Sequence, residues 1–211
     1  MFPFGIVLLL LVVRAEFVVQ NGTCPDVVPR ELDLKGIDGK WYLAAAATDL
    51  ELEGECATVM FSHKNSNTTD LSISWVNNNT VMYYNGSVSL TVDPSNNVTG
   101  DLLVVTYTDQ KTETYSFLDI NYEHYAIVFA CYDDGNSSTY ELWKLSRTPH
   151  IKDDSAAKID KVLVEYSLQD TTFVIFNNTD TLCKTNSGDY LNPSWLMMTS
   201  AAAIVLFRRL Y

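Results

Sequence analysis

The sequence predicts an all-β fold, an eight-stranded antiparallel up-and-down β-barrel with one C-terminal α-helix packed outside it. Three observations predict this fold: eight runs of alternating apolar and polar residues, short connections rich in Asn, Asp and Gly, and one later segment with helical spacing. The length of 211 residues suits a single domain, and hydrophobic residues make up 47% of the chain, which is enough to form a core.

Turn-forming residues separate the alternating runs. The segment 77–79 is three consecutive asparagines, and the segment 133–136 reads Asp-Asp-Gly-Asn. Such residues favour tight turns between sequential strands, and closing the resulting meander into a barrel pairs both edge strands. The expected strands cover residues 41–48, 56–63, 70–76, 80–92, 101–108, 112–119, 124–132 and 139–147.

The helical segment follows the eighth strand, at 153–169. Its apolar residues Ile159, Val162 and Leu163 recur at helical spacing, and two aspartates stand at its favourable N-terminal end. We expect this helix to pack against the outside of the barrel, and residues 172–176 to add a short ninth strand.

An immunoglobulin-like sandwich is the alternative fold. Cys56, Trp75 and Cys131 follow the order Cys, Trp, Cys that is found in such domains. Trp75 lies too far from Cys56, however, and the helix has no place in a sandwich. These two departures favour the barrel.

The strand phase predicts which side chains point into the barrel. Asn85 lies in an Asn-x-Ser/Thr sequon, so we place it outside and let alternation assign the rest. The four alanines at 44–47 leave volume along the wall, which favours a cavity over a filled interior. The same rule also sends Leu71, Leu90 and Leu145 inward. The candidate ligand-binding residues are Leu43, Ala45, Ala47, Val59, Phe61, Ile73, Trp75, Met82, Tyr84, Val88, Leu103, Val105, Tyr107, Tyr115, Phe117, Val128 and Trp143.

Both ends of the chain are predicted to be targeting segments. The short apolar run of residues 1–15 predicts a secretory signal peptide. Residues 187–211 predict a glycolipid-anchor signal that is removed, because small residues at 186–188 precede a short apolar tail. A single-pass membrane anchor and a C-terminal core helix are the alternatives for this tail. The barrel domain then covers residues 16–186, and the protein is expected at the cell surface.

Sequons and cysteines support secretion independently. Four cysteines without a Cys-x-x-Cys motif fit two disulfides in an oxidising compartment, and spacing alone leaves all three pairings open. Sequons predict a glycosylated exterior. They lie at Asn21, Asn67, Asn78, Asn85, Asn97, Asn136 and Asn177.

Three short motifs along the chain resemble those of the lipocalin family. Residues 39–42 read Gly-Lys-Trp-Tyr, similar to the Gly-x-Trp motif that opens the first strand of that family. Residues 119–126 resemble its second motif, and residues 145–149 resemble its third, with Arg147 at the end of the eighth strand. The motifs occur in the family's order, and the resemblance covers residues 22–184.

The resemblance is strongest to the apolipoprotein D and insect Lazarillo-type branch. It implies that Cys24 pairs with Cys131 and that Cys56 pairs with Cys183. Up-and-down strand order brings Gly39, Trp41 and Arg147 together at one end of the barrel. There, a guanidinium over an indole face closes the barrel.

Composition and missing motifs exclude several functions. The net charge of −12 disfavours nucleic acid and anionic lipid as partners. No serine elbow, phosphate loop or metal motif is present, so we expect neither an enzyme nor a resident cofactor or metal. Glu141 is the acid that alternation sends inward. It either orients a polar end of the ligand or lies in solvent at the mouth, and we expect the second because it stands near the start of its strand.

We therefore expect a non-enzymatic carrier of a small hydrophobic ligand, anchored to the cell surface through its C-terminal lipid. Fatty acids, retinoids, sterols and tetrapyrroles are the candidate ligands. The alternative is an adhesion or recognition protein that presents its barrel exterior to a cell-surface protein, for example in neuronal development.

Overall fold

The computed structural model describes residues 18–48, 50, 52, 54–65, 68–92, 100–133, 135–179 and 183. The predicted signal peptide at 1–15, the predicted anchor signal at 187–211, and the sequons Asn67 and Asn97 lie outside these residues. Those predictions therefore remain expectations.

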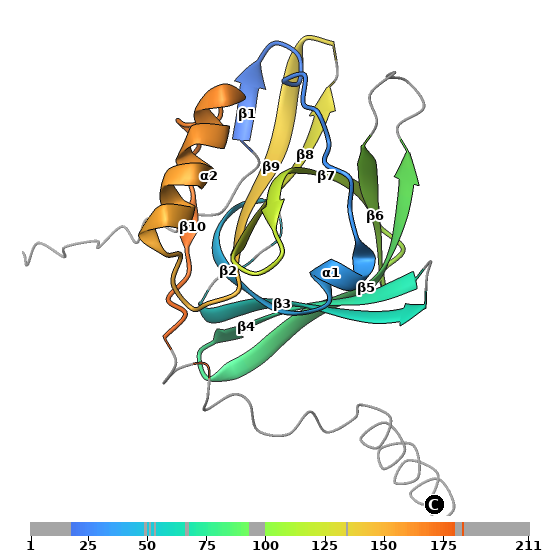
Figure 1. Cartoon of the computed structure of the whole chain (residues 1–211), viewed down its shortest axis with the longest axis vertical. Coiled ribbons are helices and arrows are strands. Elements are labelled where there is room, and N and C mark those ends of the chain that lie inside the picture. The colour runs from blue at the N-terminus through green and yellow to red at the C-terminus, as the bar shows by residue number, and fades with distance from the viewer. Residues whose placement is uncertain are drawn as a thin grey trace, which may run out of the picture.

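The predicted barrel is confirmed (Figure 1). Eight strands pair in sequence order, each antiparallel to the next, and β9 pairs back onto β2 to close the sheet. The barrel strands are β2 (Gly39–Ala47), β3 (Glu55–Asn65), β4 (Thr68–Asn77), β5 (Thr80–Val92), β6 (Asp101–Tyr107), β7 (Thr112–Asn121), β8 (Tyr125–Asp133) and β9 (Ser137–Ser146).

Two short strands extend this sheet. β10 (Val174–Ile175) is the short additional strand expected at 172–176, and it pairs with β2. β1 (Val18–Asn21), which was not predicted, pairs with β9. β2 and β9, the two strands whose pairing closes the barrel, therefore each have one additional short strand as a neighbour.

One α-helix follows the barrel, as the spacing predicts. The helix α2 (Asp153–Glu165) lies against the outside of the sheet (Figure 1). Its buried residues Ile159 and Leu163 belong to a core cluster that includes Ile127 and Leu142 from the outer face of the barrel. A second, larger cluster lies inside the barrel. The barrel wall thus has a hydrophobic core on each side.

A short helix closes one end of the barrel. The helix α1 (Leu34–Ile37), which the sequence analysis did not predict, buries Leu34 and Ile37. The fully buried Trp41 donates its indole N–H to the carbonyl of Ile37 at 2.8 Å. The Arg147 guanidinium lies 3.8 Å from the centre of the Trp41 ring.

Arg147 also binds the backbone of three segments at this end. It donates to the carbonyls of Gly36, Lys40 and Tyr122 at 2.9–3.1 Å. Gly39 has a φ of +90°, which disfavours any residue with a side chain. The predicted roles of Gly39, Trp41 and Arg147 in closing the barrel therefore agree with this geometry.

Two disulfides fix the segments before and after the barrel strands to the barrel. Cys24 pairs with Cys131 of β8, and Cys183 pairs with Cys56 of β3, as the family resemblance implies. The bonded cysteines are 107 and 127 residues apart in the sequence. Cross-links that close such long loops stabilise the folded state mainly by restricting the unfolded chain.

Candidate functional site

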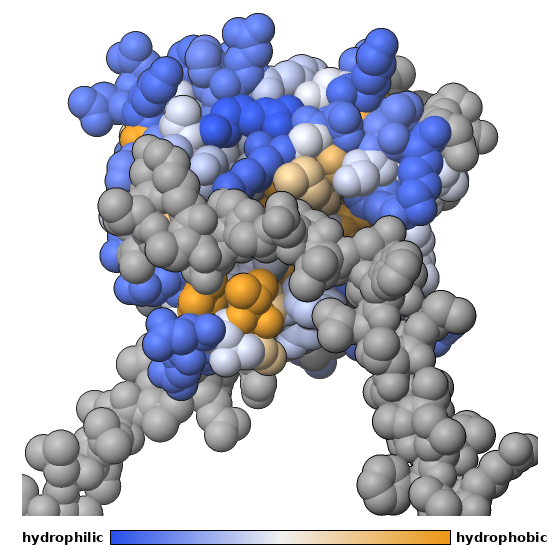
Figure 2. Space-filling model, turned by 90° about the horizontal axis from the view of Figure 1, so that it is seen from below, coloured by the Kyte–Doolittle hydropathy of each residue, from blue (hydrophilic) through white to orange (hydrophobic). Residues whose placement is uncertain are grey.

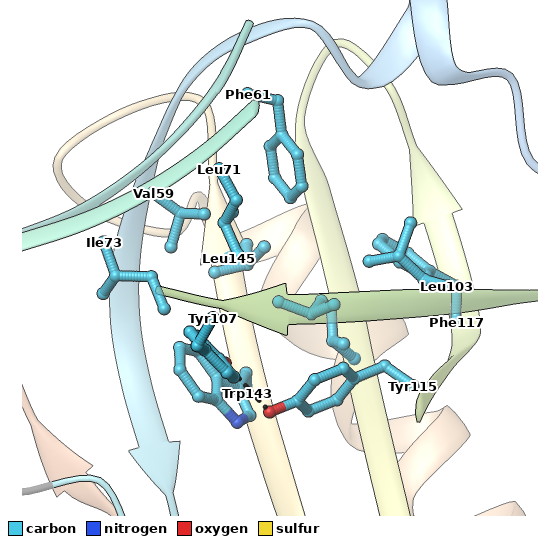
Figure 3. A pocket seen from close by; sticks show the side chains of 12 residues that line it. Val59, Phe61, Leu71, Ile73, Leu103, Tyr107, Tyr115, Phe117, Trp143 and Leu145 are labelled. Carbon is cyan, nitrogen blue, oxygen red and sulfur yellow. Dashed lines mark hydrogen bonds between the residues drawn. The ribbon is translucent and has the colours of Figure 1, made fainter. Parts of the chain in front are cut away.

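The barrel interior contains a cavity that is partly open to solvent. Strands β3, β4, β6, β7, β8 and β9 supply its walls, because every second residue of each strand points inward. The lining residues are Val59, Phe61, Leu71, Ile73, Leu103, Val105, Tyr107, Tyr115, Phe117, Val128, Trp143 and Leu145 (Figure 3).

Most of the predicted interior residues point inward. The lining residues named above were all predicted from the sequence to point inward. Leu43, Trp75 and Val88 are buried in the same interior cluster, and the partly buried Tyr84 packs against it, with its ring centre 5.3 Å from that of Trp75. Contact of these side chains with a ligand remains a prediction.

The prediction that Ala45 and Ala47 point inward is wrong. A β-bulge between Leu43 and Ala45 shifts the register of β2 against β9, so that Ala46 lies opposite Trp143. Cross-strand partners share a face of the sheet, and Ala46 is the alanine that joins the interior cluster. One extra residue in a strand reverses the facing of every residue that follows it.

The prediction that Met82 lines the cavity is also wrong. Met82 lies opposite Trp75 and therefore shares its face, but its side chain is 44% exposed. It lies near the hairpin turn at Asn78–Asn79, and its neighbours Val81 and Tyr83 are exposed as well. The end of the β4–β5 hairpin thus lies beyond the part of the interior that packing fills.

A polar cluster lies at the mouth side of the cavity. The Tyr115 hydroxyl donates to Glu113, and the Tyr107 and Tyr115 hydroxyl oxygens are 3.3 Å apart. Glu141 Oε2 accepts hydrogen bonds from Thr48 at 2.8 Å, from the Trp143 indole at 3.1 Å and from Tyr115 at 3.4 Å. Figure 3 shows the two tyrosine rings and the Trp143 indole converging below the aliphatic part of the cavity.

The expectation that Glu141 lies in solvent is wrong, because its side chain is fully buried. Glu113, which is 4% exposed, is a second interior carboxylate that the sequence analysis missed. Glu113 alternates in phase with Tyr115 and Phe117, both predicted to point inward. The same rule therefore predicts its position.

Burial, with a smaller contribution from the two carboxylates, keeps both tyrosines in their protonated form. Burial raises the pKa of Tyr115 well above its usual value, and the charges of Glu141 and Glu113 raise it further. Burial likewise raises the pKa of Tyr107, with smaller increases from the same two carboxylates. Both hydroxyls therefore act as neutral hydrogen-bonding groups at neutral pH.

Leucines of the loop after β2 cover this polar cluster. Leu50 and Leu52 are buried and belong to the interior cluster. The Thr48 hydroxyl fixes the loop from within, because it accepts a hydrogen bond from the Leu50 amide at 3.2 Å while donating to Glu141. Leu50 and Leu52 therefore add apolar side chains to the interior at this end of the barrel.

The described residues give no further indication of a metal or membrane site. Within the described ranges, no three His, Cys, Asp or Glu side chains are grouped so that they could hold a metal ion. No helix in this part of the chain is long and apolar enough to cross a membrane.

The chain matches one protein-family model. Residues 38–180 match the lipocalin / cytosolic fatty-acid binding protein family. No curated protein matches the chain in sequence. The matched range contains all eight barrel strands together with α2 and β10.

Solved structures share the fold at low sequence identity. Insecticyanin from the tobacco hornworm is 22% identical and superposes with a TM-score of 0.65, covering 80% of this chain and 93% of its own. Lobster apocrustacyanin A1 is 17% identical, with a TM-score of 0.64 and coverage of 77% and 92%. The cockroach allergen Per a 4 is 22% identical, with a TM-score of 0.55 and coverage of 73% and 95%.

Proposed function

The chain belongs to the lipocalin / cytosolic fatty-acid binding protein family, and from this premise we propose that it carries a small hydrophobic ligand in its barrel without acting on it chemically. The observation that supports the proposal best is the cavity itself, whose walls are almost wholly aliphatic and aromatic. Removing apolar ligand surface from water stabilises binding by about 25 cal/mol per Å², before ordering costs are subtracted.

Fatty acids, retinoids, sterols and tetrapyrroles are the candidate classes of ligand. Lipocalin-fold neighbours support ligand binding in general: the siderocalin Ex-FABP, 18% identical with a TM-score of 0.51, functions through dual ligand specificities. Trp143 and two tyrosines line the cavity and provide flat apolar faces for a ring or a conjugated chain.

Intrinsic tryptophan fluorescence tests the proposal, because Trp143 lines the cavity. Retinol and fatty acids are titrated into the purified barrel, and saturable quenching is expected. Val128→Phe fills the cavity, and we expect it to weaken binding at least about tenfold, or about 1.4 kcal/mol. The matched control is Val164→Phe on the exposed face of α2, where Val164 is 61% exposed.

Two results separate success from failure. Saturable quenching that is lost in Val128→Phe and kept in Val164→Phe supports the proposal. The absence of saturable quenching by every ligand in a protein that melts cooperatively contradicts it. The melting temperature of each variant is measured alongside, so that loss of binding is not confused with unfolding.

Our proposal also includes export and surface anchoring. The sequons at Asn78, Asn136 and Asn177 are exposed, so glycans at these positions meet no packing obstacle. Hydrophilic residues cover most of the described surface on the face seen in Figure 2, with hydrophobic residues in small patches. Glycosidase treatment should lower the apparent mass, and phosphatidylinositol-specific phospholipase C should release the protein from expressing cells.

An adhesion role is the second candidate, and the exposed sequons favour it because they modify the exterior of the barrel. Cells that express the anchored chain would then aggregate. Aggregation that persists in Val128→Phe would assign adhesion to the exterior, whereas aggregation lost in this variant would make it depend on the cavity.

A further inference from the structure

The cavity has two chemically different ends. Phe61, Leu71 and Leu145 form an aliphatic and aromatic region toward the closed end of the barrel, and Tyr107 and Tyr115 place hydroxyls toward the mouth (Figure 3). A ligand that fills the cavity therefore meets apolar walls along its body and polar oxygens at its outer end.

The hydrogen-bond directions at the polar end determine what those oxygens can bind. A tyrosine hydroxyl carries one proton, and Tyr115 directs its proton to the carboxylates of Glu113 and Glu141. The hydrogen bond between the two tyrosines must then run from Tyr107 to Tyr115. The Tyr107 oxygen is left as an acceptor at the end of this chain.

The other side-chain hydrogen-bond donors of the cluster also donate to a carboxylate. The Trp143 indole N–H and the Thr48 hydroxyl both donate to Glu141. The ammonium of Lys111 lies 2.5 Å from Glu113 Oε1, so the cation at this end is already paired with a carboxylate. Each of these side-chain donors therefore donates to a carboxylate, except Tyr107, which donates to Tyr115.

On this basis we propose that the carrier selects ligands whose polar end donates hydrogen bonds, above all a protonated primary amine on an apolar body. Such a group supplies the proton that the Tyr107 oxygen accepts, and its positive charge is attracted by the nearby carboxylates Glu113 and Glu141. A carboxylate head group has oxygens that only accept hydrogen bonds, and it would place them beside the Tyr107 oxygen, which is also an acceptor. Its negative charge would be repelled by Glu113 and Glu141. This inference rests on the proposed function and narrows its ligand class, because it disfavours fatty acid anions.

A homologous series of probes tests the selection. Octylamine, 1-octanol and octanoate share one apolar chain and differ only at the head group, and each is titrated calorimetrically at pH 7. We expect octylamine to bind at least about tenfold more tightly than octanoate, with octanol between them. Octanoate that binds as tightly as octylamine would overturn the inference, even though the carrier function would stand. If none of the three binds, the inference is overturned, and the titrations with retinol and fatty acids decide the carrier function separately.

Two variants locate the effect in the polar cluster. Glu141→Gln keeps the side-chain shape but removes one charge, so octylamine should lose about tenfold in affinity while octanol changes by less than about threefold. Glu165→Gln on the exposed surface of α2 is the matched control and should change neither. If Glu141→Gln does not fold, Tyr107→Phe serves instead, because it removes only the terminal acceptor. An unchanged ratio of octylamine to octanoate affinity in the folded variant would overturn the assignment.

Discussion

At the scale of single residues, Arg147 joins several separate segments at the closed end of the barrel. Its guanidinium stacks on Trp41 and donates to carbonyls of α1, β2 and the turn before β8. Lys40 and Gly36 lie 107 and 111 residues before Arg147 in the sequence, so one planar group joins the first barrel strand and the helix before it to the end of the last barrel strand. The fixed fork geometry of arginine allows all of these contacts at once.

Replacing Arg147 should therefore destabilise the fold without altering the cavity. Arg147→Ala removes the stacking and three hydrogen bonds to carbonyls, and we expect it to lower the free energy of unfolding by about 2–4 kcal/mol. Arg147→Lys should recover only part of this loss, because an ammonium is not planar. Urea denaturation measures both, with Lys158→Ala on exposed α2 as the control. Unchanged stability in Arg147→Ala would refute the closed-end assignment.

At the scale of elements, α2 shows how a surface helix acquires a fixed position. Its N-terminal turn contains Asp153 and Asp154, which suit the positive end of the helix dipole. Ile159 and Leu163 are buried against the outer face of β8 and β9, whereas Val164 is 61% exposed. Packing of this one apolar face, more than helix propensity, holds the helix on the barrel.

Two truncations to alanine on α2 should separate the contribution of packing to stability from that of helix propensity. Leu163→Ala leaves a cavity between helix and sheet and should cost about 2–4 kcal/mol of stability. Val164→Ala on the adjacent, exposed position should be neutral to within about 0.5 kcal/mol. Thermal unfolding of both variants provides the comparison. Equal effects would mean that the helix does not pack as described.

The elements also show how far alternation can predict the site. On β6, β7 and β9 alternation continues without interruption through the residues that line the cavity, so Tyr107, Tyr115 and Trp143 were predicted correctly. On β2 the bulge falls within four consecutive alanines, where no contrast between polar and apolar residues marks the change of phase. Glu113 was predictable from its phase but was overlooked, although its partners Lys111 and Tyr115 lie only two residues before and after it in the sequence.

At the scale of the whole molecule, buried phenols link stability to alkaline pH. Tyr107 and Tyr115 lie inside the barrel, and Tyr125 lies under α2, where its hydroxyl donates to Asp119 at 2.6 Å. Burial raises the pKa of all three, and the hydrogen bond to Asp119 adds to the shift of Tyr125. Both hydrophobic cores therefore contain tyrosines that resist ionisation while the protein is folded.

The sign of the pH effect follows from these shifts. Unfolded tyrosines ionise near pH 10, whereas the pKa of folded Tyr125 is raised to about 12. The stabilisation is complete below pH 10 and is lost as the pH rises toward 12, because the unfolded state releases its protons first. Denaturation series from pH 8 to about 12 should show this decline in the free energy of unfolding, and Tyr125→Phe should make it shallower. A decline of equal steepness in Tyr125→Phe would show that Tyr125 does not contribute. An increase in tyrosinate absorbance before unfolding would show that the interior phenols ionise in the folded barrel.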